Sequence, residues 1–137
     1  MRFATAAAAA CMGDGTNKGL APLLAGGSIT FYNGTYPGAS TVENMHTSQT
    51  NFGTYVLPTP TITNGTISWS GITFAAANTG TGTPTWFQIT TSGGSPLVDG
   101  SVGQTGSGSD ITFTTTSWSQ NATIVVSTLG ITIPSES

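Results

Sequence analysis

The sequence predicts an all-β domain, a β-sandwich or small barrel of about eight short antiparallel strands, behind a short helical or flexible alanine-rich arm. Three observations predict this class. Apolar and polar residues alternate in short segments after residue 27, which is the period of strands. Asn-Gly and glycine-rich turns separate these segments. Three Trp, six Phe and a mean hydropathy of +0.09 supply a core despite few charges. We therefore divide the chain into an arm, residues 1–27, and a β-sandwich domain, residues 28–137.

The arm contains two segments that favour helix. An alanine run at residues 6–10 has high helix propensity, and Gly13 ends it. A second apolar stretch, residues 20–25, contains Pro22 and is closed by Gly26. This stretch predicts one turn of helix before the first strand.

The strands follow in order from residue 28. Residues 28–32 alternate and stop at Asn33-Gly34, and residues 35–51 form a long loop of the kind that often carries function. The segment 85–91 alternates most clearly, and residues 92–95 are its hairpin turn. The other predicted strands are 52–57, 67–74 with a break at Gly71, 97–102, 111–115 and 122–133.

The last strand changes its buried face. Its apolar residues have even numbers up to Val126 and odd numbers from Leu129, which predicts a β-bulge at or beside Gly130. The predicted core of the sandwich consists of Phe87, Ile89, Ile111, Phe113, Ile124 and Val126.

Charge is scarce, with two basic and five acidic residues and a net charge of -3. Two basic residues cannot supply the phosphate contacts that nucleic-acid binding requires, so nucleic acid is excluded as a principal ligand. No stretch approaches the roughly 18 to 20 apolar residues of a membrane-spanning helix, so a membrane partner is not expected. Weak self-repulsion favours assembly over a freely diffusing monomer. The single cysteine, Cys11, excludes an intrachain disulfide.

The residue types that usually carry catalysis do not form a recognisable pattern in this sequence. The carboxylates lie in different segments, and we interpret Asp99 and Asp110 as turn or strand-end residues that bond their own backbone. His46 is the only histidine and has no nucleophile motif beside it. We expect no enzyme activity, no metal site and no cofactor.

One segment resembles a known group of proteins. A Thr85-Trp86-Phe87 strand, a glycine-rich hairpin and a return from Val98 through Asp99-Gly100 to Gly103 resemble a motif of small structural proteins of tailed bacteriophages. The likeness extends loosely to the alanine-rich beginning, to residues 26–34 and to residues 131–134. The resemblance implies a virion protein, either a capsid decoration (cement) protein or a related head or tail surface protein.

On this basis we expect a protein that binds and stabilises the outer surface of a phage head, with the major capsid protein and copies of itself in a symmetric homo-oligomer as partners. The alternative is a carbohydrate-binding or adhesin-like module, with Trp86, Tyr32 and Tyr36 as an exposed aromatic platform for a glycan. The expected interface combines apolar residues that the strands cannot easily bury with residues of the long loop: Phe3, Leu20, Leu23, Leu24, Tyr36, Met45 and His46.

Overall fold

The computed structural model describes residues 1–3, 19–36, 49–63, 66–76 and 81–132, and the fold in this part of the chain is mostly β. Its helix is α2, Leu20–Leu24. Its strands are β1 (Arg2–Phe3), β2 (Ser28–Tyr32), β3 (Asn51–Val56), β4 (Thr61–Thr63), β5 (Thr66–Ala75), β6 (Trp86–Thr90), β7 (Pro96–Gln104), β8 (Ile111–Phe113) and β9 (Thr123–Thr132). The predicted all-β class is confirmed.

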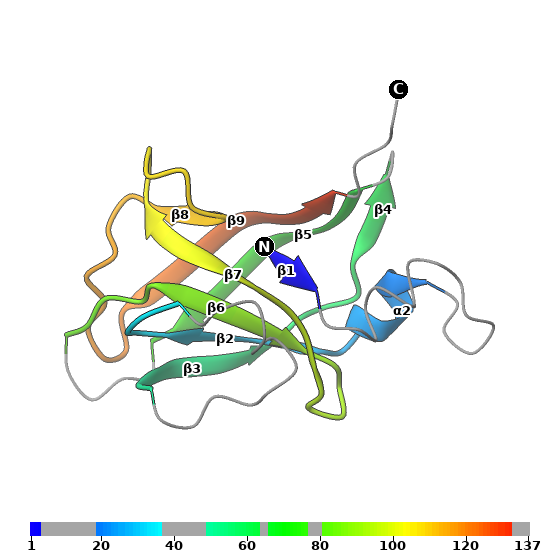
Figure 1. The fold of residues 1–137 in the computed structure, drawn as a ribbon, viewed down its shortest axis with the longest axis horizontal. Coiled ribbons are helices and arrows are strands. Elements are labelled where there is room, and N and C mark those ends of the chain that lie inside the picture. The colour runs from blue at the N-terminus through cyan, green and yellow to red at the C-terminus, as the bar shows by residue number, and fades with distance from the viewer. Residues whose placement is uncertain (4–18, 37–48, 64–65, 77–80, 133–137) are drawn as a thin grey trace.

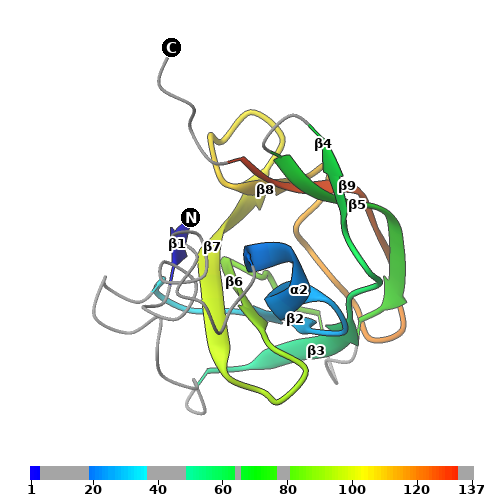
Figure 2. The ribbon, with the colours of Figure 1, turned by 90° about the vertical axis from the view of Figure 1, so that its right-hand side faces the viewer.

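The strands form two sheets. The larger sheet has the order β1-β7-β6-β2-β3, with β8 also paired to β7, and the smaller has the order β4-β5-β9. The larger sheet curls into a half-barrel, and the long β5–β9 pair crosses its concave side (Figure 1). Seen from one end, α2 lies in the opening between the two sheets (Figure 2). The core therefore has three walls: two sheets and one short helix.

One pair of strands departs from the expected antiparallel arrangement. Strand β8 pairs with β7 in parallel, with Val102 opposite Ile111. Strand β1 pairs with the same edge of β7 in antiparallel orientation, through Val98 and Asp99. Two short strands from distant parts of the sequence thus share one edge of β7. The expectation of a purely antiparallel sandwich is wrong at this edge.

The change of face in β9 has a different cause from the predicted bulge. The β5–β9 register is constant from Thr66 opposite Thr132 to Ala75 opposite Thr123, so no extra residue is inserted beside Gly130. Strand β5 changes its buried face at the same level, because Trp69 and Ile72 are both buried. Between them Gly71 has a φ of +66°, outside the range of an ordinary strand. Both strands therefore turn over together, and the predicted bulge is wrong.

Helix α2 is part of the core. Leu20 is 3% exposed, Leu24 is fully buried, and both pack in the main apolar cluster. The turn of helix predicted at residues 20–25 is confirmed. The argument that the strand framework cannot bury these leucines is wrong, because the half-barrel leaves an open end that the helix fills. The described parts of residues 1–27 thus belong to the β domain, while the alanine run lies outside the described residues.

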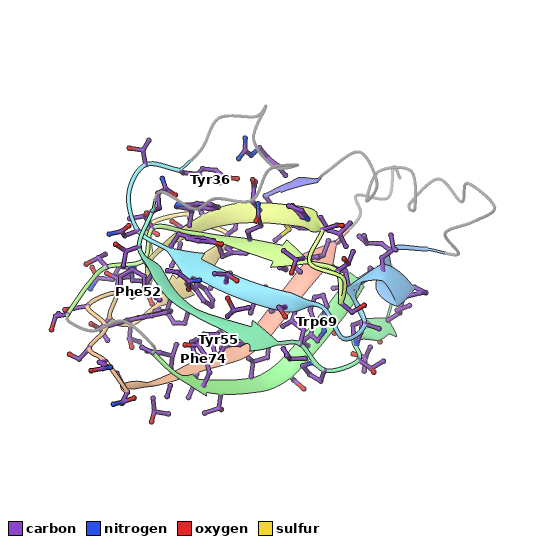
Figure 3. The ribbon with its side chains drawn as sticks, turned by 90° about the horizontal axis from the view of Figure 1, so that it is seen from below. Tyr36, Phe52, Tyr55, Trp69 and Phe74 are labelled. Carbon is purple, nitrogen blue, oxygen red and sulfur yellow. The ribbon has the colours of Figure 1, made fainter. Side chains whose placement is uncertain are left out.

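The centre of the core is aromatic. Trp118 is 1% exposed although it belongs to no strand, and its ring centroid lies 5.2 Å from that of Phe31 and 6.0 Å from that of Phe74. Figure 3 shows Phe52 and Phe74 between β3 and β5, with Tyr55 beside them. Of the predicted core residues, Phe113 is partly buried and the other five are buried.

The barrel is open along one seam. A cleft of about 320 Å³ lies between β8 and β9, lined by Asp110, Ile111, Thr112, Val125, Val126, Leu129 and Gly130. In the described residues β9 pairs only with β5, so its other edge faces this cleft. Strand β4, which follows Pro58 and Pro60, was not predicted, and it gives the smaller sheet its second edge.

Candidate binding face

The convex face of the larger sheet carries a row of polar side chains. Strand pairing places Arg2 opposite Asp99, Asp99 opposite Gln88, and Gln88 opposite Thr30. Thr30 is in turn opposite Thr54 on β3. We call these five residues the polar row. Because opposite residues in neighbouring strands point to the same face, the row crosses the whole sheet on the side away from the core.

Burial varies along the polar row. Asp99 is fully buried, Gln88 is 1% exposed and Thr30 is 5% exposed, whereas Thr54 is exposed. The row thus runs from a buried charge at the β1–β7 end to an exposed hydroxyl on β3. A sheet whose outer face is polar and yet largely buried in its middle differs from the usual solvated outer face.

The buried end of the row is an ion pair with a tyrosine. Arg2 Nε donates to Asp99 Oδ1 at 2.9 Å and Arg2 Nη2 to Asp99 Oδ2 at 2.8 Å. The Tyr36 hydroxyl donates to Asp99 Oδ1 at 2.9 Å, and the Arg2 guanidinium carbon lies 4.6 Å from the centre of the Tyr36 ring. Figure 3 shows Tyr36 on the opposite side of the larger sheet from Phe74. This two-point geometry is the strong form of a carboxylate–guanidinium contact.

The surroundings of this cluster shift two pKa values. Burial is the main cause that raises the pKa of Tyr36 to about 12; Asp99 also raises it, and Arg2 acts in the opposite direction. Burial alone lowers the pKa of Arg2, but the hydrogen bonds and charges of Tyr36 and Asp99 outweigh it and raise that pKa. At neutral pH the cluster is therefore a fixed ion pair with a neutral phenol, which is a structural arrangement rather than a proton-transfer site.

Asp110 connects the two short strands on the edge of β7. Its Oδ2 accepts from the backbone N–H of Ser101 at 2.8 Å, and its Oδ1 accepts from the Met1 ammonium at 2.8 Å. Burial by itself raises the pKa of Asp110, but these donors outweigh it and lower the pKa. The prediction of a strand-end residue that bonds backbone is confirmed for Asp110. It is wrong for Asp99, which lies in the middle of β7 and bonds side chains.

The predicted aromatic platform is not exposed. Trp86 is fully buried and Tyr32 is 5% exposed, and their rings stack with centroids 4.4 Å apart. The Trp86 Nε1 group donates to the Asn33 carbonyl at 3.2 Å. Tyr36 is half-buried over Arg2. These three rings therefore do not offer a flat surface to a sugar, and the platform as predicted from the sequence is wrong.

A groove lies at the exposed end of the polar row. It has a volume of about 500 Å³, and its walls come from β2, β3 and the end of β6 with the following turn. The lining residues are Ser28, Thr30, Tyr32, Gln49, Asn51, Thr54, Thr90, Thr91, Ser92 and Gly94. Hydroxyl and amide groups line it, and none of these side chains is charged at neutral pH. We call this feature the hydroxyl groove.

Three large apolar side chains are exposed in the described residues. They are Val56 at 73%, Ile62 at 65% and Val125 at 52%. Ile62 stands opposite Ile67 and thus shares its face of the smaller sheet, but Ile67 is 5% exposed because the core covers it. Ile62 therefore extends the core-facing row of apolar residues from β5 onto β4, where the core no longer covers it. Its strand, β4, is an edge strand of Thr-Ile-Thr without a charge.

The predicted interface residues have different positions. Leu20 and Leu24 are inside the core and cannot contact a partner while α2 is docked. Leu23 is partly buried against the core. Tyr36 belongs to the ion-pair cluster described above. Met45, His46 and the side chain of Phe3 lie outside what the structure describes.

The described residues contain few groups for chemistry. Their two carboxylates, Asp99 and Asp110, both take part in ion pairs. They contain no group of three or more His, Cys, Asp or Glu residues that could hold a metal ion. Within the same ranges no helix is long and apolar enough to cross a membrane.

No protein family, curated protein or solved structure matches this chain. The function of the protein is therefore inferred from its residues and their geometry.

Proposed function

We propose that this protein is a virion structural protein, a capsid decoration protein that binds the outer surface of a phage head and associates with copies of itself. The proposal includes no catalytic activity. The observation that carries it is the uncharged edge strand β4 with its exposed Ile62. Such an edge attaches a module to a larger assembly through backbone hydrogen bonds and apolar contact.

The charge distribution supports contact without electrostatic attraction. Of the described charged side chains, Arg2 and Asp99 neutralise each other and Asp110 pairs with the Met1 ammonium. Natural edge strands are commonly protected from pairing by short length, lysine, proline or an inward charge; β4 has only three residues, but it carries no lysine, proline or charge. Its edge is therefore open to a strand from a neighbouring subunit.

Two copies fit this edge in one simple way. Antiparallel pairing of β4 with β4 of a second copy around a two-fold axis joins two three-stranded sheets into a continuous six-stranded sheet. Ile62 from each copy then lies near the axis and loses its exposure to water. Contact with the shell is formed by the remaining neutral exterior and depends little on salt.

The test uses heads assembled from a major capsid protein encoded in the same genome as this chain, and a genome that encodes none contradicts the proposal. We expect the full-length protein to co-sediment with these heads at a saturable ratio that changes by less than about threefold between 0.05 and 1 M NaCl. Ile62→Lys should lower self-association, because it places a like charge on both sides of the two-fold axis. Thr73→Lys adds the same charge at an exposed position of the same sheet, away from the edge, and should leave self-association unchanged.

Three outcomes contradict parts of the proposal. If the protein does not bind saturably to heads, the proposed decoration role is refuted. Loss of binding in high salt removes the neutral-contact mechanism. Equal self-association of the Ile62→Lys and Thr73→Lys variants removes β4 as the contact between copies.

A further inference from the structure

The hydroxyl groove has the chemistry of a ligand site, and the proposed contact between copies through β4 does not use it. We propose that it binds a neutral saccharide, through hydrogen bonds along its walls rather than through ring stacking. This inference does not depend on the proposed function, because the groove lies on the larger sheet and β4 belongs to the smaller one. Its size of about 500 Å³ falls within the range of roughly 300–1,000 Å³ that small-molecule sites occupy.

The walls exclude charged ligands. A free Arg or Lys favours an anion, but no lining residue is basic, and Arg2, the cation of the polar row, is held by both oxygens of Asp99. A cation requires carboxylates, and no lining residue is acidic. The ligand that fits is therefore uncharged.

The walls also fit a ligand that carries many hydroxyls. The Thr30 and Thr54 hydroxyl oxygens lie 2.8 Å apart at the base, and each hydroxyl can rotate to donate or accept. Each threonine that lines the groove also carries a methyl group, so the wall contains both polar and apolar atoms. A sugar ring likewise carries both O–H and C–H groups, whereas a purely apolar ligand leaves the wall hydroxyls without partners.

One wall residue has unused hydrogen-bonding capacity. Gln49 Nε2 donates to the Thr35 carbonyl at 3.0 Å, while Gln49 Oε1 is buried without a partner among the described residues. Buried side-chain oxygens are normally paired, since an unpaired one costs free energy. Because Gln49 lines the groove, this oxygen is the acceptor that a ligand hydroxyl would pair with once the side chain moves.

The site differs from the aromatic platform that the sequence predicted. Tyr32 lines the groove but is 5% exposed, because its ring is stacked on Trp86. It therefore offers little ring surface to a ligand, and the contacts come from hydroxyls and amides. A site of this type binds weakly, with a dissociation constant on the order of 1 mM, since each net hydrogen bond contributes only about 1 kcal/mol.

The test is a titration of the full-length, isotope-labelled protein followed by backbone amide chemical shifts. The probes are neutral trisaccharides of glucose, galactose, mannose or N-acetylglucosamine, each up to about 20 mM. Sorbitol tests whether any polyol suffices, and a sialylated trisaccharide tests the charge argument. We expect at least one neutral trisaccharide to shift amides in residues 28–32, 49–54 and 90–94, with sorbitol causing no saturable shift.

Two matched variants locate the site. Thr54→Val removes a wall hydroxyl while keeping the shape of the side chain, and it should weaken saccharide binding by about fivefold. Thr73→Val makes the same change at an exposed position of β5 outside the groove and should leave binding unchanged. Thermal melts show whether both variants remain folded.

The inference is overturned if none of the four neutral trisaccharides causes saturable shifts at about 20 mM. It is also overturned if the shifts lie outside the groove segments, if sorbitol binds equally well, or if the sialylated trisaccharide binds more tightly than every neutral one. Equal binding by Thr54→Val and Thr73→Val has the same consequence.

Discussion

A two-point ion pair joins Arg2, on the short strand β1, to Asp99 in the neighbouring strand β7. Asp99 has no exposed side-chain surface, and the Arg2 side chain is 21% exposed. A buried carboxylate depends on its counter-charge, because the protein interior solvates an isolated charge poorly. The two partners are therefore unequal. Arg2 keeps some contact with water whether or not Asp99 is present, whereas the Asp99 carboxylate has no contact with water and depends on Arg2 as its counter-charge.

This asymmetry predicts unequal mutational effects. Arg2→Met should lower the free energy of unfolding by about 3–5 kcal/mol, because it leaves a buried charge without its partner. Asp99→Asn keeps the shape and removes that charge, so it should cost less. Urea denaturation of both variants and the parent gives the comparison. Equal costs for the two variants would show that Asp99 does not depend on the guanidinium.

Tyr36 predicts a loss of stability in alkali. Its pKa of about 12 in the folded protein lies above the ordinary value of 10.0, so the folded state binds the phenol proton more tightly than the unfolded state. The resulting stabilisation is complete below pH 10 and is lost as the pH rises to about 12. Burial also raises the pKa of Tyr32, so the change in the parent has two contributions.

Tyr36→Phe separates these two contributions. Denaturation midpoints measured from pH 9 to pH 12 should fall less steeply in the variant than in the parent, because only the contribution of Tyr32 remains. Titration of the tyrosines, followed by the absorbance of the phenolate, gives an independent measurement of their pKa values. Identical slopes for the two proteins would assign the alkaline loss to other groups.

At the scale of elements, the larger sheet has two buried faces. Strand β6 is buried throughout, with Phe87 and Ile89 toward the core and Trp86 and Gln88 on the opposite face. The alternation of the sequence placed Phe87 in the core correctly. It also placed Trp86 on the face expected to be the less sensitive one, and the structure shows that this side chain is fully buried as well.

Truncation of either aromatic residue should therefore be costly. Phe87→Ala and Trp86→Ala should each lower the free energy of unfolding by about 3–5 kcal/mol, through loss of buried area and creation of a cavity. Val56→Ala, at a position that is 73% exposed, is the control and should change it little. The measurement is the denaturant midpoint. A cost for Trp86→Ala as small as that for Val56→Ala would contradict the burial of the outer face.

At two positions in or beside strands, a residue other than glycine would be costly, for different reasons. Gly71 combines a φ of +66° with open space around the position of a Cβ, so Gly71→Ala should cost about 1–2 kcal/mol of backbone strain. Gly71→Asn should cost less, because asparagine tolerates this region. At Gly27 a Cβ would collide with the backbone carbonyl of Thr90. Gly27→Ala should be the most destabilising of the three in thermal melts, and a reversed order would refute the assignment.

Sequence patterns predicted the strands better than their pairing. Alternation located β2, β3, β5, β6, β7 and β9, because most of these strands have buried apolar residues at alternate positions over at least part of their length. It could not show that β8 joins β7 in parallel, since pairing partners leave no local pattern. Trp118 was missed as the centre of the core because it lies outside any strand. Arg2 and Asp99 are 97 residues apart, and only the folded topology brings them together.

At the scale of the whole molecule, α2 closes the half-barrel. Leu20 and Leu24 supply apolar surface that neither sheet provides at that end (Figure 2). Deleting residues 2–25 therefore removes both this helix and the counter-charge of Asp99. Such a truncation does not leave an intact β domain, contrary to the expectation of a removable arm.

The corresponding prediction concerns stability. Deletion of residues 2–25 should unfold the domain or lower its Tm by at least about 15 °C, because the lost core contacts approach the total stability of a small domain. Leu20→Ala with Leu24→Ala should reproduce most of this loss, whereas Pro22→Ala, at an exposed position of the same helix, should not. Thermal unfolding followed by circular dichroism measures the Tm of each variant and of the parent. A truncated protein that melts within a degree or two of the parent would restore the separate arm.

The pairing of β5 with β9 also determines when the chain can fold. Thr66 pairs with Thr132, so the smaller sheet consists of β4 and β5 alone until the last strand has been synthesised. Strand β1 likewise waits for β7, from which 97 residues separate Arg2 and its partner Asp99. Closing such long loops costs entropy before any contact offsets it, which makes folding slow. During translation the uncharged edge of β5 that pairs with β9 is therefore exposed to other nascent chains until β9 has been synthesised.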